Sequence, residues 1–463
     1  MKNTAKSVNP FGMADKIGYM FGDFGNDFTF LLSSAFLMKF YTDVMGVSAA
    51  VVGFMMMLAR VVDAFTDVAM GQIADRSKTG RKGKFTPWLL RMSGPVALAS
   101  FLMYATWFQN MPMGFKIFWM FFTYLLWGSI FYTSINIPYG SMASAISPEA
   151  KDRTELSSWR TIGATLANTV IGVVLPLVVY YEDANGNQIL SGQRMTFAAL
   201  ICSIGAVICY LICYRMTTER VKIGRMKEKF SFSALLKYLF SNRALIGIVV
   251  AALLLLLAQL TLTGMGNYIY PNYFGNAKIL SIATLMTSIL TIGLSGFMGR
   301  LSAKYGKKEL STIGALIGAA ALFIAFLVHT RSVVVWLIFY VFSYLGIAVF
   351  NIVCWAMITD VIDDAEVSTG KRSDGTIYAV YSFARKLGQA ASSGLIGTLL
   401  SVIGYSTATA FDRKVVDGIY NITCLVPMAG FILLALSLQF LYPLSKKKVD
   451  DNIQYLKEKR ERK

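Results

Sequence analysis

Long apolar segments separated by short polar stretches run through this sequence. Twelve can be counted, six on each side of a polar stretch near the middle, and they cover residues 18–41, 49–74, 87–107, 115–146, 158–181, 196–216, 244–268, 280–301, 310–328, 333–359, 376–403 and 418–444. Each is long enough to cross the hydrocarbon core of a bilayer as a helix, which takes about 20 residues. Since a bilayer offers no partner for free backbone groups, each segment is predicted to be a helix. The predicted fold class is therefore an all-α membrane protein with twelve transmembrane helices.

The positions of lysine and arginine predict how these helices are oriented. Basic residues gather after the second, sixth, eighth and tenth segments and in the C-terminal tail. Cytoplasmic loops carry such an excess of basic residues, so both termini are predicted to be cytoplasmic. We expect a multi-pass protein of the plasma (inner) membrane. Its predicted parts are an N-terminal bundle (1–217), a cytoplasmic linker (218–243), a C-terminal bundle (244–445) and a charged cytoplasmic tail (446–463).

Two polar turns resemble each other at a spacing of about half the chain. The turn after the second segment runs from Gly71 through Arg76, and the turn after the eighth runs from Gly299 through Lys304. A shared pattern of glycine followed by a cation, at equivalent places, indicates a duplication. We therefore expect two pseudo-symmetric six-helix bundles, an arrangement typical of transporters with a midplane site. Two ordinary basic turns are the alternative interpretation.

Composition excludes several classes of protein. Of the 463 residues, 55% are hydrophobic and only 15% are charged, too few polar residues to cover the surface of a soluble enzyme. The net charge of +18 lies between apolar segments and in the tail, which argues against nucleic acid as a partner. Neither a phosphate-binding loop nor a nucleophile–base pair is visible, so no enzyme activity and no cofactor are expected. The expected partners are membrane lipids and a small-molecule substrate, and the chain is expected to be a monomer.

Ionisable residues in the middle of the second segment form the first candidate site. Arg60, Asp63 and Asp67 are spaced by three and four positions, so they share one helix face. Two carboxylates about one turn apart repel each other unless a cation, a proton or a basic neighbour compensates them. Oxygen ligands suit hard cations, so this pair predicts a sodium or proton site. A structural ion pair between Arg60 and one of the acids is the alternative.

Further polar residues occur in the middle of other segments, where they are costly and by default functional. Asp27, Asn136 and Arg160 could together hold a polyhydroxylated ligand, and Lys386 needs an acid such as Asp63 or a substrate. Trp355 could stack on a sugar face or simply pack. For each polar residue, a hydrogen bond that joins two helices is the alternative. At the end of the tenth segment, Asp360 and Asp363 are expected to pair with basic loops and latch a gate, together with Arg60 and Arg372.

The chain resembles the glycoside–pentoside–hexuronide:cation symporter family of the major facilitator superfamily. The resemblance covers nearly the whole sequence, and its most specific parts are residues 41–48, 60–71, 81–88, 127–138, 360–372 and 383–388. It implies that Asp63 and Asp67 coordinate the coupling cation, with Thr66 and Thr133 close by. It also matches Asp27, Arg160 and Lys386 to positions of the family's sugar site. The full set of expected substrate-binding residues is Asp27, Asn136, Arg160, Lys386, Trp355, Asn26 and Ser382.

The sequence departs from the family's best-known member at several of these positions. Asn136 stands where that carrier has an acid, and Asn26 stands where it has a lysine. Gly140 replaces a tryptophan, and Thr66 replaces an asparagine near the cation. The acids of the cation site are therefore intact while the sugar site is altered.

The resulting hypothesis is a secondary active transporter. It would carry a glycoside, pentoside or hexuronide together with Na⁺ or H⁺ by alternating access. Arg160 and Lys386 would suit an acidic sugar. Two alternatives stay open, namely a carrier of the same fold with a lipid-like or other non-sugar cargo, and a membrane sensor that binds sugar without moving it.

Overall fold

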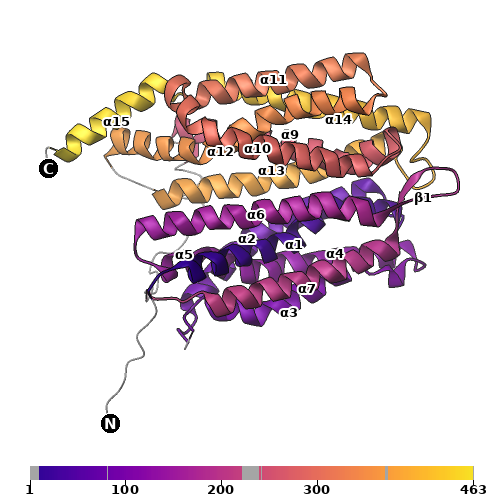
Figure 1. Ribbon diagram of the computed structural model, residues 1–463, viewed down its shortest axis with the longest axis horizontal. Coiled ribbons are helices and arrows are strands. Elements are labelled where there is room, and N and C mark those ends of the chain that lie inside the picture. Colours follow the sequence, from indigo (N-terminus) through magenta and orange to yellow (C-terminus); the bar gives the residue numbers. More distant parts are fainter. Residues whose placement is uncertain (1–9, 81, 222–238, 241, 371–373, 462–463) are drawn as a thin grey trace, which may run out of the picture. The chain divides into compact units, whose positions relative to one another are not determined.

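The structure is a computed structural model, which describes residues 10–80, 82–221, 239–240, 242–370 and 374–461. Long helices coincide with all twelve predicted segments (Figure 1). In chain order they are α1 (Met13–Asp43), α2 (Ala49–Arg76), α3 (Thr86–Leu102), α4 (Met113–Leu125) continued through the π-helix η2 (Leu126–Tyr132) into α5 (Thr133–Ile146), α6 (Ala150–Val179), α7 (Gly192–Met216), α9 (Arg243–Tyr268) continued by the π-helix η3 (Ile269–Tyr273), α10 (Lys278–Tyr305), α11 (Lys307–Val328), α12 (Val333–Thr369), α13 (Asp374–Val402) and α14 (Arg413–Phe440). A single turn of 3-10 helix, η1 (Thr106–Phe108), follows α3.

Among the described residues, nine helical stretches are long and apolar enough to cross a membrane. The stretches outside this set are α1, α3 and α13. Helix α1 carries Asp23, Asn26 and Asp27 in its middle, α13 carries Arg385 and Lys386, and α3 has 17 residues. Polar residues in mid-helix lower the mean hydropathy of α1 and α13, and these helices hold candidate site residues.

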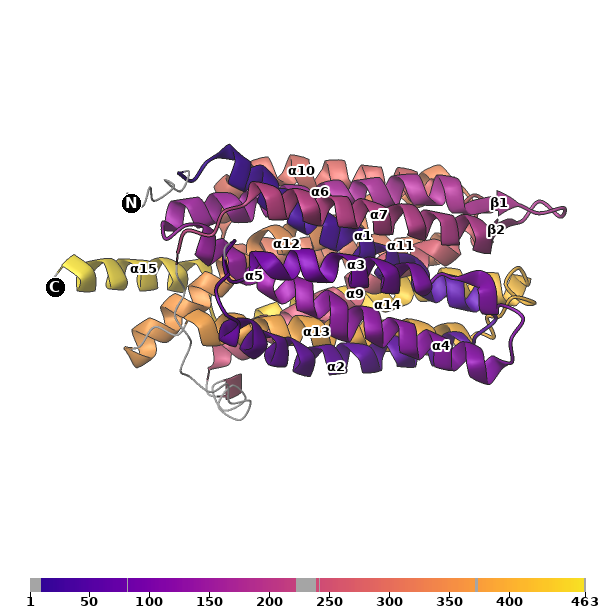
Figure 2. The same ribbon diagram turned by 90° about the horizontal axis from the view of Figure 1, so that it is seen from below.

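Three features differ from the sequence-based picture. Helix α12 continues to Thr369, beyond the predicted end at residue 359, so the acids that follow lie on a helix. The tail after residue 446 forms a helix as well, α15 (Lys446–Glu461). The connection from α6 to α7 contains a two-stranded hairpin of β1 (Tyr180–Glu182) and β2 (Gln188–Leu190), visible in Figure 2.

The chain divides into two compact units. The first consists of residues 1–47, 62–181 and 190–229, and the second of residues 48–61, 182–189 and 230–463. The domain bounds predicted from the sequence stay a prediction, and most of the expected linker (218–243) falls outside the described residues. The first half of α2 groups with the second unit, whereas the second half, which carries Asp63 and Asp67, groups with the first.

In the first unit, the segment after α7 ties several helix ends together. The Glu219 carboxylate accepts hydrogen bonds of 2.6–2.8 Å from the backbone N–H groups of Lys84, Phe85 and Thr86, at the start of α3. The guanidinium of Arg220 donates to the Asp15 carboxylate at 2.8 Å. A carboxylate at the N-terminus of a helix satisfies free N–H groups and favours the helix dipole. The ends of α1, α3 and α7 are thereby fixed to one another.

In the second unit, small residues let α13 pack directly on the first half of α2. A Cβ atom at Gly53 would lie 2.7 Å from the carbonyl oxygen of Ser393 and 2.9 Å from the Cα of Gly397. The backbone N–H of Ala50 donates to the Ser401 hydroxyl at 2.8 Å. Glycine at such positions allows helix backbones to approach closely, as is common between membrane helices.

Candidate functional site

The two acids of α2 face two hydroxyl groups of the fourth helical stretch. The Ser129 hydroxyl donates to Asp63 Oδ1 at 2.6 Å, and the Thr133 hydroxyl donates to Asp67 Oδ1 at 2.9 Å. The two acids are four positions apart on their helix, and so are the two hydroxyl residues. The two hydrogen bonds therefore lie about one helical turn apart along the helices. Asp63 is 5% exposed and does not face a lipid surface.

The local sequence explains how this contact forms. Ser129 lies in the π-helix η2, and its neighbour Gly128 has no side chain to separate the helices. A Cβ atom at Gly128 would lie 3.8 Å from Asp63 Oδ1. A π-helical turn inside an α-helix is frequently found at functional sites. This distance is an ordinary van der Waals contact, so it shows that the backbone of η2 lies next to Asp63 but does not make glycine a requirement at position 128.

The side chains that contact one another here, Asp63, Asp67, Ser129 and Thr133, all offer oxygen. The hydroxyl of Thr66, which was expected near the cation, donates to the Asp63 main-chain carbonyl at 3.3 Å. Among the described residues, no group of three or more His, Cys, Asp or Glu residues could hold a metal ion. Two carboxylates and two hydroxyls suit a monovalent hard cation better than a transition metal.

A second polar cluster of the first unit surrounds Arg160. Its Nε donates to Asp23 Oδ1 at 2.9 Å, and its guanidinium lies 5.5 Å from the centre of the Tyr139 ring. Asp27 lies close enough to interact electrostatically with both Asp23 and Arg160. Asp23 is therefore the ion-pair partner of Arg160, a role that the sequence analysis did not assign to it. Its position four residues before Asp27 on the same helix face was the available signal.

The two expected asparagines lie in contact with each other in the same unit. Asn26 Nδ2 is 3.5 Å from Asn136 Oδ1, and the Tyr210 hydroxyl donates to Asn26 Oδ1 at 2.8 Å. Asn26 is 1% exposed, whereas Asn136 is half-buried. The buried amide of Asn26 can therefore fix the orientation of the more exposed amide of Asn136. Helix α1 thus carries the partners of both residues, because Asp23 pairs with Arg160 and Asn26 with Asn136, and Asp27 lies on the same helix.

The expected residues of the second unit lie on α12 and α13. Trp355 is 48% exposed, and its ring meets that of Tyr381 edge to face at 5.5 Å. Ser382 is exposed and Lys386 is half-buried. The neighbouring Arg385 places its guanidinium 5.8 Å from the centre of the Trp355 ring. Sequence reasoning passed over Arg385 because Lys386 beside it already matched the family's motif.

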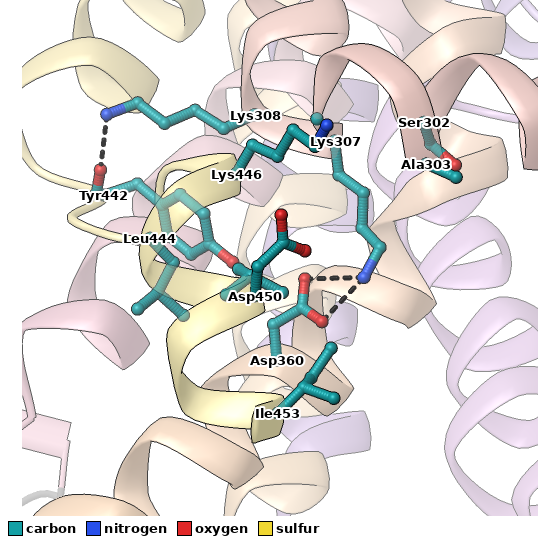
Figure 3. A pocket seen from close by; sticks show the side chains of 12 residues that line it. Ser302, Ala303, Lys307, Lys308, Asp360, Tyr442, Leu444, Lys446, Asp450 and Ile453 are labelled. Atoms are coloured by element: carbon teal, nitrogen blue, oxygen red, sulfur yellow. Dashed lines mark hydrogen bonds and ion pairs between the residues drawn. The ribbon is translucent and has the colours of Figure 1, made fainter. Parts of the chain in front are cut away.

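One of the expected gating acids, Asp360, forms an ion pair inside the second unit. Lys307 Nζ lies 2.6 and 2.8 Å from the two carboxylate oxygens of Asp360, which joins the start of α11 to α12 (Figure 3). Asp364 accepts a hydrogen bond of 3.0 Å from Asn452 of α15. Asp363 is half-buried, Arg60 is 9% exposed, and Arg372 lies outside the described residues. A latching role for these residues stays a prediction.

Comparison with known proteins places the chain in a family. The sequence profile described as "MFS/sugar transport protein" matches residues 18–446. The chain belongs to this family of sugar transporters. It is 32% identical over 456 residues to an uncharacterized symporter of Bacillus subtilis, with 96% of each chain covered. It is 31% identical to the glucuronide carrier protein homolog of Escherichia coli, with 93% of each covered.

Other relatives agree on sugar as the cargo and on the fold. An isoprimeverose transporter of Lactiplantibacillus pentosus is 28% identical, with 92% of this chain and 88% of the relative covered. The crystal structure of a D-xylose–proton symporter superposes with a TM-score of 0.63 at 15% identity, covering 94% of this chain and 98% of the other. The chain is thus a multi-pass membrane protein of the major facilitator fold that carries a sugar by cation symport, and it is not an enzyme. A lipid-like cargo and a pure sensor role find no support among these relatives.

Proposed function

We propose that the coupling cation binds between Asp63 and Asp67 and that it is sodium. The observation that carries the proposal is the pair of hydrogen bonds from Ser129 and Thr133 to these acids. A hydroxyl that donates its proton to a carboxylate turns its lone pairs toward a cation on the same carboxylate. Four oxygen-bearing side chains favour a sodium ion, whereas proton binding requires only a single carboxylate.

The sugar, in this proposal, contacts the cluster around Arg160 in the first unit. Arg160 and Asp27 offer a donor and an acceptor for adjacent hydroxyl groups, and Asn136 offers both. Cation binding neutralises the acids of α2 and thereby changes the free-energy difference between the conformations of the carrier. The cation drives uptake only if its affinity differs between these conformations, and the coupling to sugar affinity is reciprocal.

The names of the relatives do not by themselves choose a sugar. They include a glucuronide carrier homolog, whose named cargo is acidic, and an isoprimeverose transporter, whose named cargo is neutral. We propose a location in the inner membrane with both termini cytoplasmic, which follows from the distribution of basic residues, and a monomeric carrier.

The test is uptake by the purified protein in proteoliposomes with a panel of sugars, under a sodium gradient and separately under a proton gradient. We expect accumulation against a sugar gradient only when sodium is higher outside. Accumulation driven by a pH gradient in sodium-free buffer would contradict the choice of ion. Equal sugar affinity with and without either cation would contradict the coupling at these acids.

A further inference from the structure

Arg385 lies at an unusual place for an arginine. It is the twelfth residue of α13, which has 29 residues, so it lies well inside a membrane-spanning helix. A charged side chain at this depth is costly unless an acid, a backbone carbonyl or water compensates it. The identity of its partner is therefore informative.

The contacts of Arg385 are with aromatic side chains. Its guanidinium lies 5.8 Å from the centre of the Trp355 ring, whose own neighbour is the Tyr381 ring, edge to face at 5.5 Å. Within the part of the chain that the structure describes, no ion pair joins Arg385 to an acid. An aromatic ring attracts a guanidinium and holds its plane, but it leaves most of the N–H donors without an acceptor.

The surroundings of Arg385 are polar along both helices. Asn351, Trp355 and Thr359 follow each other at intervals of four on α12, so they lie on one helix face. Asn351 Nδ2 donates to Gln259 Oε1 at 3.0 Å. On α13, Ser382 and Gln389 flank Arg385 at the spacing of one turn. A face this polar is not suited to lipid, and it is accessible because Trp355 is 48% exposed.

The arginine of the first unit offers a contrast. Arg160 also lies over an aromatic ring, that of Tyr139, but its Nε is paired with the Asp23 carboxylate. Arg160 is therefore paired with an acid of this chain, whereas Arg385 lies on an aromatic ring and has no ion pair with any acid among the described residues. We propose that Arg385, held on Trp355, binds the negatively charged group of the substrate, and that the cargo is an acidic sugar bearing a carboxylate or sulfonate. This inference rests on the proposed function as a cation-coupled sugar carrier.

Arginine suits this role physically. Its planar fork of donors matches the two oxygens of a carboxylate, which a lysine cannot reproduce. A site built to pair with a charge rejects the neutral analogue, because its own polar group would then be left without a partner. The expected discrimination is about tenfold to a hundredfold in favour of the acidic sugar.

The test compares two probes that differ only at one carbon, methyl β-D-glucuronide and methyl β-D-glucoside. The full chain in proteoliposomes is expected to take up the glucuronide at a concentration at least about tenfold lower. In R385Q this preference is lost, while cation-driven uptake of the glucoside persists. In R385K part of the preference returns, because charge is restored without the fork geometry.

A matched control is R331Q. Arg331 lies 4.0 Å from the centre of the Tyr273 ring in the same unit, but it is paired with Asp417 between α11 and α14. We expect R331Q to keep the preference for the glucuronide.

The outcomes separate this inference from the proposed function. A wild-type chain that prefers the glucoside, or an R385Q variant that keeps its preference, overturns the inference while leaving sugar symport intact. Equal loss of both probes in R385Q and R385K also overturns it, because it shows a structural role. A wild-type chain that takes up neither probe under any cation gradient overturns the proposed function and the inference together.

Discussion

The two units carry opposite charges in the middle of their helices. The first unit has four acids there, Asp23, Asp27, Asp63 and Asp67, against the single base Arg160. The second unit has the bases Arg60, Arg385 and Lys386, and the described middle parts of α9 to α14 contain no acid. Acids in excess suit a cation, and bases in excess suit an anion. The contrast supports our proposals that the ion binds in the first unit and that the charged group of the sugar binds in the second.

The same contrast separates two arginines that resemble each other locally. Both lie over an aromatic ring, and in the family fold α6 and α13 are the fifth helices of their bundles. Only Arg160 has a carboxylate within hydrogen-bonding distance in the described part of the chain. A buried charged side chain that forms an ion pair within the protein has a structural or orienting role. A charged side chain without such an ion pair is available to bind an oppositely charged group of the substrate.

The strongest test of the acidic unit is D63N. The amide keeps the shape of the side chain but removes the charge that holds the cation. We expect concentrative uptake to fall to the level of passive equilibration, while exchange of sugar across the membrane survives. The control is D75N near the end of the same helix, where Asp75 lies 3.8 Å from Lys84. Unimpaired accumulation in D63N would show that this acid does not couple the cation.

The ion pair of Arg160 can be broken from either side. D23N leaves the guanidinium without its partner, so the free energy of unfolding should fall by about 2 kcal/mol, measured by denaturant titration in detergent. This is less than the about 3–5 kcal/mol of a fully buried pair, because the Arg160 side chain is 42% exposed. The double variant D23N/R160Q should recover part of the loss. If the double variant is no more stable than D23N, then the pair is not what stabilises this cluster.

Adding an acid to the first unit should weaken the preference for acidic sugars. N136D places a carboxylate beside Asn26, near Asp27, and this charge repels a negatively charged cargo. We expect the preference for methyl β-D-glucuronide over methyl β-D-glucoside to fall about tenfold. The control N185D changes the exposed hairpin and should leave the ratio unchanged. An unchanged ratio in N136D would contradict the proposal that the sugar contacts this cluster.

The smallest expected effect concerns the hydroxyl on Asp63. S129A removes one hydrogen bond of about 1 kcal/mol, so the sodium concentration for half-maximal uptake should rise about fivefold. S141A is the matched control, because the Ser141 hydroxyl donates to the Ile137 carbonyl of its own helix. An identical sodium dependence in S129A and the wild type would remove this hydroxyl from the proposed cation site.

The length and number of the apolar segments were sufficient to predict the fold, and the spacing of charged residues within them was sufficient to predict part of the site. All twelve helices were predicted because a run of about 20 apolar residues has few alternatives in a bilayer. The pair Asp63 and Asp67 could be predicted because both acids lie on one helix, where a spacing of four fixes their mutual position. The extension of α12 to Thr369 was missed because the acids after residue 359 ended the apolar run, although they do not end a helix.

Partners on different helices could not be predicted in the same way. Ser129 and Asp23 were missed because their significance depends on which face of a neighbouring helix they meet. Arg160 was correctly singled out as a polar residue in a span, but its partner Asp23 follows from packing between α1 and α6. That no described acid pairs with Arg385 likewise depends on neighbouring helices, so spacing along one helix could not predict it.

The amino-acid sequence by itself determined the twelve apolar helical segments, the family and the acids on α2, because these depend on interactions local to the chain or on the bilayer. Tertiary structure decided which hydroxyl donates a hydrogen bond to which acid. It also decided which arginine forms an ion pair with a carboxylate among the described residues. The physical reason is that the energy of a charge in a membrane helix is set by the few atoms within hydrogen-bonding distance, and most of those atoms belong to other helices.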